Sequence, residues 1–595
     1  MCGIAGILTH RQAGEARLDE ALAKMQEALR RRGPDDAGLW HSKCKRVRLA
    51  HTRLAILDLT PAGHQPMLTA DGRHCIVFNG EIYNFMELRA ELERGGVVFQ
   101  TRTDTEVLLR LYERDGSAMV ERLRGMFALA VWDAQEQRAF LARDPLGIKP
   151  LYYVQQECML AFASEVRALQ KAGLTGHELD GGALRRYFES GSVAEPQTLL
   201  KNVRSLPAGH TLTWAGGHTE MRPFWRFRFD AADMGAEAAV SLTRDALLDS
   251  VRHHFVSDVP VGVFLSGGID STAVLALSIA AGQRDLETFS IGVDDAGLDE
   301  SSAAARTAAH FGTRHHELRL DAAAMSASFP AFLASVDQPS IDGFNTFTVA
   351  AFARAQGMKV VLSGLGGDEL FGGYPSFQRV PRLARLVRRL HPVPGMPLCG
   401  ALLERWLPRA PWRRAAGLLR HPPSMTRAWR AFRGVFTAPE ACALAARYTG
   451  GAVETGPKPD DVEISSADER DQISALELGL YMRNQLLKDS DVMSMAHGLE
   501  LRVPLVDRCL FEAVARIPAA LRLQPGKRLL VDAVPEIPRW ISQAPKRGFL
   551  FPYEKWLASE WGGAFQEVAA RLPVATPSWY QLWSVFMLER WLERV

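Results

Sequence analysis

The sequence predicts an α/β protein in two parts, an α/β sandwich followed by a doubly wound parallel sheet with helical additions. Three observations carry this prediction. The chain has 595 residues, more than one hydrophobic core usually supports. Short apolar runs separated by turns fill roughly the first 200 residues, as in packed sheets. Beyond them, strand-like runs alternate with Ala-rich helical stretches, as in a parallel sheet covered by helices.

The sandwich is predicted from strand-like runs interrupted by two helical patterns. The runs occupy residues 4–8, 49–57, 75–78, 126–132, 139–142 and 151–153. Residues 18–30 and 86–94 carry apolar side chains at three-to-four spacing, which indicates helices packed on sheets.

The second part begins after a polar segment at residues 226–233. A long helical pattern at 236–255 precedes a strand-like run at 261–265. Further strands are expected at 286–293, 315–320 and 359–362, separated by helices, and the remainder is expected to be mostly helical.

The composition excludes several classes of protein. Hydrophobic residues make up 47%, charged residues 23% and the net charge is +2, a globular balance that argues against a nucleic-acid partner. The seven cysteines have no zinc-ligand or redox spacing. The most apolar stretch, 259–281, contains Asp270 and several glycines, so no transmembrane segment is predicted. The N-terminus lacks the pattern of a signal peptide, so a cytoplasmic location is expected.

Cys2 is the first candidate catalytic residue. Removal of Met1 would leave a thiol and a free α-amine on one residue. The thiol is the nucleophile, and the α-amine, with a pKa of about 7.7 to 8.0, is suited to take its proton.

Four segments, the first of which contains Cys2, resemble the class II glutamine amidotransferase domain. This domain is an N-terminal-nucleophile αββα sandwich shared by asparagine synthetase and glutamate synthase. The segments are MCGIAG at 1–6, RGPD at 32–35, FNGEIYN at 78–84 and TDTE at 103–106. The resemblance implies a glutaminase domain over residues 2–212 with glutamine as substrate.

The same resemblance implies roles for five further residues. Arg53 would bind the glutamine carboxylate, which suits a bidentate guanidinium. Glu81 and Asp104 would hold the amino group, and Asn79 with the Gly80 N–H would form the oxyanion hole. Structural alternatives stay open, since Asn-Gly is a common hairpin turn and an Asp often caps a helix.

A glycine-rich loop follows the predicted strand at 261–265. LSGGIDS at 265–271 precedes an apolar helix, a setting in which backbone N–H groups face phosphate. It is not a Walker A motif, because it has neither the lysine nor the spacing. It resembles the pyrophosphate loop of the ATP pyrophosphatases, which implies an ATP site comprising Leu265, Ser266, Gly267, Gly268, Asp270 and Ser271.

A second loop, SGLGGDELFGGY at 363–374, also follows a strand and resembles the companion loop of asparagine synthetases. Ser363, Gly364 and Ile291 match nucleotide-contacting positions of that family. Asp270 and Asp368 are predicted Mg²⁺ ligands, because Mg²⁺ takes one or two carboxylates plus phosphate oxygens. The alternative for Asp368 is an acidic surface loop.

The resemblance to asparagine synthetases continues to the end of the chain. It includes YMRNQLLKDSD at 481–491, ELRVPLVD at 500–507 and KRGF at 546–549, and it implies an ATP pyrophosphatase domain over residues 235–590. Lys546 aligns with the lysine that stabilises charge at the adenylate; the alternative is a surface lysine whose stem lies on apolar surface. The implied reaction joins ammonia from glutamine to a carboxylate activated by ATP, with release of AMP and pyrophosphate. Two coupled sites also imply a protected passage for ammonia.

The acceptor carboxylate is left open by Leu365. Asparagine synthetases often carry glutamate there, tied to the aspartyl adenylate. Either another group, such as Glu369 or Asp342, takes over the role of that glutamate, or the acceptor is a sugar acid, a peptide or a specialised metabolite. Aspartate is the default. A plain glutaminase would leave the strand-end loops unexplained, and a non-catalytic regulatory protein should have lost Cys2 or Asp270.

An Arg-rich insert is predicted at about residues 378–471. Its arginines recur at helical spacing, which favours a solvated helical insert over a membrane-surface or anionic-substrate role. The family resemblance also allows a homodimer. The insert arginines are Arg379, Arg382, Arg385, Arg388, Arg389, Arg405, Arg409, Arg413 and Arg414.

Overall fold

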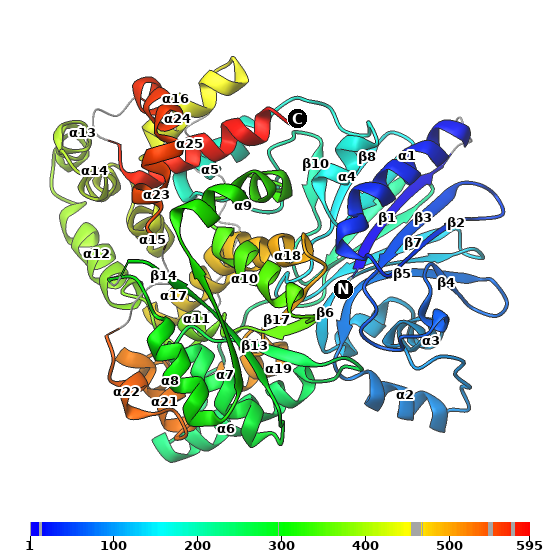
Figure 1. The fold of residues 1–595 in the computed structure, drawn as a ribbon. Helices are drawn as coiled ribbons and strands as arrows, with labels where there is room; N and C mark the ends of the chain where they lie inside the picture. Colours follow the sequence, from blue (N-terminus) through cyan, green and yellow to red (C-terminus); the bar gives the residue numbers. More distant parts are fainter. Residues whose placement is uncertain are drawn as a thin grey trace.

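The first half is a four-layer sandwich of two antiparallel sheets between helices (Figure 1). The computed structural model describes residues 2–10, 15–295, 297–453, 466, 468–545, 551–572 and 577–595. The first sheet has the order β10 (Val203–Ser205), β8 (Tyr152–Gln156), β9 (Met159–Ala163), β1 (Cys2–Thr9), β3 (Val47–Arg53), β2 (Asp36–His41). The second has the order β12 (His218–Pro223), β11 (His210–Ala215), β7 (Arg138–Arg143), β6 (Gly125–Asp133), β5 (His74–Ile82), β4 (Met67–Leu68).

Three hydrophobic clusters separate the layers of the sandwich. One lies between the sheets and includes Ile4 and Val77. The other two join each sheet to its outer helices. These helices are α1 (Glu15–Leu29), α4 (Val166–Lys171) and α5 (Gly181–Ser190) on the first sheet and α2 (Phe85–Arg94) and α3 (Asp104–Asp115) on the second.

The second half contains one parallel sheet of five strands. Its order is β15 (Arg314–Leu320), β14 (Glu287–Val293), β13 (Val261–Phe264), β16 (Val360–Leu362), β17 (Glu500–Arg502). The chain winds outward from β13 through β14 to β15 and then returns to the other side through β16 and β17. The sheet is therefore doubly wound, and its switch point lies between β13 and β16.

Helices cover both faces of this sheet. One face packs on α6 (Ala236–His254), α7 (Ile269–Ala280), α8 (Ser301–Phe311) and α21 (Arg528–Ala533). The other packs on α9 (Ala322–Ser335), α10 (Phe344–Ala355) and α18 (Lys488–Met495). The fold class predicted from the sequence is confirmed.

The remaining helices enclose the carboxyl end of the sheet and build the insert. They are α11 (Gly367–Phe371), α12 (Ser376–Leu390), α13 (Met396–Trp406), α14 (Ala410–Gly417), α15 (Met425–Arg433), α16 (Ala438–Thr449), α17 (Glu469–Leu476), the π-helical η5 (Glu477–Leu487), α19 (Arg508–Val514), α20 (Ala519–Arg522), α22 (Arg539–Ser542), α23 (Tyr553–Glu560), α24 (Gly562–Arg571) and α25 (Trp579–Leu592).

Two boundaries differ from the prediction. The second sheet continues past residue 212, because β12 pairs with β11 as far as Pro223. The strand predicted at 49–57 ends at Arg53, after which the chain turns away to form a loop. Within the described ranges, no helix combines the length and the apolar character needed to cross a bilayer.

Candidate active site

The first site forms where β1, β3 and β5 meet. Cys2 begins β1 and lies opposite Arg53 in the antiparallel pairing with β3. The backbone N–H of Cys2 donates to Asn79 Oδ1 at 3.0 Å. Asp104 begins α3 and accepts from the Ile82 N–H at 3.1 Å. The structure therefore gathers residues from three separate predicted segments around Cys2.

A loop of backbone carbonyls fixes the Arg53 guanidinium. Its nitrogens donate to the carbonyl oxygens of Thr60 at 2.9 Å, Leu57 at 3.1 Å and Asp58 at 2.5 Å. A Cβ at Gly63 would lie 1.9 Å from Arg53 Nη2, so a glycine is needed there. Arg53 is thus an immobilised cation facing the first residue of β1.

Asn79 supplies a donor that is buried without a partner. Its Oδ1 accepts from Cys2, whereas its Nδ2 has no hydrogen-bond partner in the part of the chain that the structure describes. Such an atom costs free energy unless a ligand satisfies it. The next residue, Gly80, runs so close to β6 that a Cβ would meet the Met126 carbonyl at 2.1 Å.

Burial shapes the electrostatics of this pocket. It raises the pKa of the Cys2 thiol, it raises the pKa of Asp104 to about 6, and together with the charge of Glu500 it raises the pKa of Glu81 well above its usual value. Glu500 is also buried, but Arg502, which donates to it at 2.5 Å, helps to lower its pKa to about 2.

Arg32 ties Cys2 to the second half of the chain, a role that the sequence did not reveal. Its Nε donates to the Cys2 carbonyl at 3.1 Å. Its two terminal nitrogens donate to Glu165 at 3.0 Å and to Asp491 at 2.7 Å. Lys149 also donates to Asp491, at 3.2 Å. All of these side chains are buried.

The second site lies at the switch point of the parallel sheet. The loop after β13 passes Gly267, with φ at +73°, and opens α7. The loop after β16 comes so close that a Cβ at Gly364 would lie 2.7 Å from the Ser271 N–H nitrogen. Ser271 Oγ lies 3.1 Å from Ser266 Oγ and accepts from the Ser266 N–H at 3.2 Å. The two glycine loops therefore lie directly against each other and form one cradle.

This cradle lines a cavity of about 1420 Å³. That volume exceeds the roughly 300–1,000 Å³ of common small-molecule pockets. Every residue predicted for ATP contributes to its wall: Leu265, Ser266, Gly267, Gly268, Asp270, Ser271, Ile291, Ser363 and Gly364. Lys546 lies outside the described residues.

Lys527 joins the two predicted Mg²⁺ ligands and was missed by the sequence reasoning. Its Nζ donates to Asp270 Oδ2 at 2.5 Å and forms an ion pair with Asp368. Burial opposes the charge on Lys527, yet the two carboxylates raise its pKa. The partners lie far apart in the sequence, and no motif surrounds Lys527, so no local signal marked it.

The two carboxylates fit a magnesium ion as far as the donor set goes. They meet beside a glycine cradle, and Mg²⁺ typically takes one or two carboxylates together with phosphate oxygens and water. Across the described ranges, no group of three or more His, Cys, Asp or Glu side chains gathers into a metal-binding cluster. A magnesium ion held by these two carboxylates would take its remaining ligands from phosphate oxygens and water.

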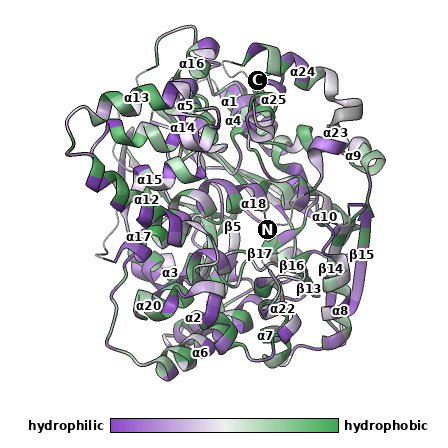
Figure 2. Ribbon diagram, turned by 90° about the vertical axis from the view of Figure 1, so that its left-hand side faces the viewer, coloured by the Kyte–Doolittle hydropathy of each residue, from purple (hydrophilic) through white to green (hydrophobic). Residues whose placement is uncertain are grey.

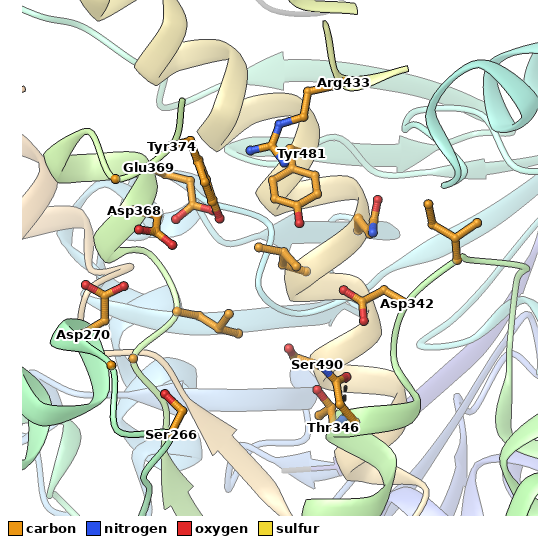
Figure 3. Close-up of a pocket in the computed structure, with 18 of the residues that line it drawn as sticks. Ser266, Asp270, Asp342, Thr346, Asp368, Glu369, Tyr374, Arg433, Tyr481 and Ser490 are labelled. Atoms are coloured by element: carbon orange, nitrogen blue, oxygen red, sulfur yellow. Dashed lines mark hydrogen bonds between the residues drawn. The ribbon is translucent and has the colours of Figure 1, made fainter. Parts of the chain in front are cut away.

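The opposite wall of the cavity carries the residues considered for the acceptor. Figure 3 shows Asp342, Thr346 and Ser490 across the pocket from Asp270 and Asp368. Leu365 also lines the cavity, so no carboxylate stands at that position. Burial raises the pKa of Asp342.

The insert closes the cavity from the side of α15. The Arg433 guanidinium lies 4.3 Å from the ring centre of Tyr374 and 3.8 Å from that of Tyr481, and it donates to the buried Glu477 at 2.7 Å. By contrast, the five predicted arginines of α12 are exposed. The arginines of α12 therefore face solvent, whereas α15 and two further predicted arginines, Arg409 and Arg414, line the cavity. The solvated role of the insert stays a prediction.

Two family models match the chain. A glutamine amidotransferase domain matches residues 1–225, and asparagine synthase matches residues 242–593. The glutamine-hydrolysing asparagine synthetase 1 of Bacillus subtilis is 33% identical over 592 residues, covering 94% of this chain and 88% of that protein. A putative glutamine-hydrolysing asparagine synthetase of Mycobacterium tuberculosis is 35% identical over 585 residues, covering 91% and 86%. Amidase chry2 of Gibberella zeae is 32% identical over 407 residues, covering 64% and 60%.

Fold, strand-end cradle and sequence similarity together define a glutamine-dependent amide ligase that uses ATP. The chain belongs to the asparagine synthase family, and it carries both the glutamine amidotransferase part and the synthase part of that family.

Proposed function

We propose that the chain hydrolyses glutamine at Cys2 and passes the ammonia to a carboxylate adenylated in the cavity at the switch point. The observation that carries the proposal is that α18 and β17 contribute neighbouring residues to both sites. Ser490 and Leu501 line the cavity, while the adjacent Asp491 and Glu500 lie on the Cys2 side, where Asp491 binds Arg32.

In the glutaminase half, Arg53 binds the glutamine carboxylate, and Glu81 with Asp104 holds the amino group. The Cys2 thiolate attacks the side-chain amide carbon, and its proton passes through the α-amine to the leaving nitrogen. Asn79 Nδ2 and the Gly80 N–H stabilise the oxyanion. Ammonia leaves, and water then hydrolyses the thioester to glutamate.

In the synthase half, the cradle from Leu265 to Ser271 binds the ATP phosphates through backbone N–H groups and the N-terminus of α7. The acceptor carboxylate attacks the α-phosphorus, pyrophosphate leaves, and ammonia then displaces AMP from the acyl carbon. Lys527 supplies positive charge beside the phosphates. A magnesium ion on Asp270 and Asp368 would neutralise charge on the leaving pyrophosphate.

Ammonia needs a route closed to water, because the ammonium ion that forms in solution is not a nucleophile. The proposed route crosses the junction between Asp491 and Glu500, where buried ion pairs exclude solvent. Along α18 and β17, Ser490 and Leu501 line the cavity, whereas the neighbouring Asp491 and Glu500 accept hydrogen bonds from Arg32 and Arg502.

Two acceptors are tested first. Aspartate is the acceptor implied by the names of the synthetase relatives. A larger carboxylate is favoured by the cavity of about 1420 Å³ and by Leu365, which supplies neither a charge nor a proton acceptor beside the cradle.

The decisive measurement is pyrophosphate release by the full chain with ATP, Mg²⁺ and glutamine, with and without aspartate, while mass spectrometry identifies the amide. Asparagine formed together with pyrophosphate would assign aspartate. Glutamine hydrolysis without asparagine would leave the reaction class intact and move the acceptor to a larger carboxylate.

The Cys2→Ala variant tests the division of labour between the halves. We expect it to abolish glutamine-dependent amide synthesis and glutamine hydrolysis, while the free ammonia in equilibrium with an added ammonium salt still supports synthesis. Loss of ammonia-dependent synthesis in a variant with unchanged circular dichroism would contradict separate sites.

A further inference from the structure

Helix α13 presents its apolar side to solvent. Leu398, Leu402 and Trp406 recur every four residues and so share one face. They are 73%, 60% and 77% exposed. A surface helix normally turns such a stripe towards the core.

The packing of α13 on its neighbours fixes this orientation. A Cβ at Gly400 would lie 2.9 Å from the Ala416 carbonyl, so the helix approaches α14 closely on that side. Glu404 points the same way and accepts from Arg420 at 2.7 Å. The small and acidic residues therefore face inward, and the apolar stripe faces outward.

The stripe belongs to a larger surface, here called the insert patch. Half of the large apolar side chains exposed in the described part of the chain lie between residues 386 and 412, a concentration typical of an interaction site. Both views place α12, α13 and α14 at one edge of the molecule, and Figure 1 shows the amidotransferase sheets at the opposite side (Figures 1 and 2). The insert patch comprises Leu386, Val393, Leu398, Leu402, Leu403, Trp406 and Trp412.

The segment that carries the insert patch is strongly basic. Residues 378–420 contain ten arginines and one acidic residue, Glu404, a formal charge of +9, whereas the whole chain carries +2. The rest of the chain is therefore net acidic. Part of this charge is paired, because Arg385 and Arg388 contact Glu469, and Arg413 contacts Glu440. Other arginines of the same segment are exposed, namely Arg379, Arg382, Arg389 and Arg405.

We propose that the insert patch docks the protein on an anionic lipid bilayer. Leucine and tryptophan side chains enter the headgroup region, and arginines bind the lipid phosphates, as in interfacial amphipathic helices. A second copy of the chain would bring two basic segments together, which repel. A nucleic acid would neutralise the arginines but leave the apolar stripe of α13 in water.

Docking would also orient the large cavity. The turn after Trp406 passes through Pro408 and Arg409, both of which line the cavity, so the cavity reaches the edge of the insert patch. An acceptor held at a membrane surface would meet the cavity there. The docking itself is independent of the proposed reaction.

Cosedimentation of the full chain with sucrose-loaded vesicles tests the proposal. We expect binding to vesicles of phosphatidylglycerol and phosphatidylcholine, little binding to pure phosphatidylcholine, and weaker binding at high salt. The double variant Leu402→Glu with Trp406→Glu should lower the bound fraction at least about tenfold. Arg389→Glu with Arg405→Glu should weaken binding and flatten its salt dependence.

The matched control is Val98→Glu, because Val98 is 80% exposed but lies in the amidotransferase half. This variant should bind vesicles like the unmodified chain, and all variants should retain glutamine hydrolysis, which reports folding. Absence of vesicle binding, or equal binding by the Leu402/Trp406 variant, would overturn the proposal. So would a dimer in size-exclusion chromatography that this variant dissociates without any lipid binding.

Discussion

Asp489 lies buried on α18 and accepts a hydrogen bond from the Ser340 hydroxyl at 2.5 Å. Burial and the nearby charge of Asp342 raise its pKa to about 8. The folded protein therefore holds a proton that the unfolded chain, with an ordinary pKa of about 3.9, releases near neutral pH.

The pH dependence of stability follows from this proton. Unfolding releases it between the two pKa values, so the contribution of Asp489 to stability is greatest at low pH and is lost as the pH rises towards about 8. The stability of the unmodified chain relative to Asp489→Asn should therefore fall over that range. Urea unfolding of both proteins from acid to neutral pH measures their free energies of unfolding. If the unmodified chain instead became more stable relative to the variant as the pH rises, the raised pKa of Asp489 would be contradicted.

At the scale of elements, the proposed ATP cradle depends on how closely two strand-end loops approach. A Cβ at Gly364 would meet the backbone of Ser271 at 2.7 Å, and backbone there cannot move without displacing α7. Gly364→Ala should push the loops apart and lower ATP-dependent pyrophosphate release about a hundredfold. Glutamine hydrolysis at Cys2 should be unchanged.

Gly235 supplies the control for this substitution. A Cβ there meets nothing within 4 Å, so Gly235→Ala should leave pyrophosphate release unchanged. If both variants behaved alike, the close approach of the loops would not be what Gly364 provides.

At the scale of the whole molecule, buried ion pairs join the two halves. Arg32 binds Asp491 beside Cys2. Arg124 binds Asp507 through two nitrogens at 3.0 and 2.9 Å. Removing one partner of a buried pair costs about 3–5 kcal/mol of stability.

The two pairs should differ in their effect on coupling. Asp491→Asn and Asp507→Asn both remove a buried charge between the halves, so both should lower stability in urea unfolding. Only Asp491→Asn disturbs the proposed ammonia route, so only there should glutamate formation exceed pyrophosphate release. Equal ratios in the two variants would place the route elsewhere. A cytoplasmic location and a homodimer stay predictions.

Much of the architecture was predictable because it follows from local spacing. Alternation and apolar runs located β5, β6, β14 and β15, and the strand–glycine–helix order located the glycine loop at Gly267. Short strands were missed, among them β17, whose Glu500 and Arg502 are charged yet buried. Their burial depends on pairing with each other and with Glu81.

The two-part fold and the glycine loops could be predicted from the sequence, because apolar alternation and a strand–glycine–helix order are patterns of neighbouring residues. The residues proposed to surround Cys2 were predicted from short motifs, although they come from separate segments of the chain. Three features could be found only in the folded structure: Lys527 contacts both Asp270 and Asp368, Arg32 contacts Asp491, and α13 turns its apolar side outward. Charge pairing and burial depend on which distant segments come into contact, and the local sequence around a residue does not indicate those contacts.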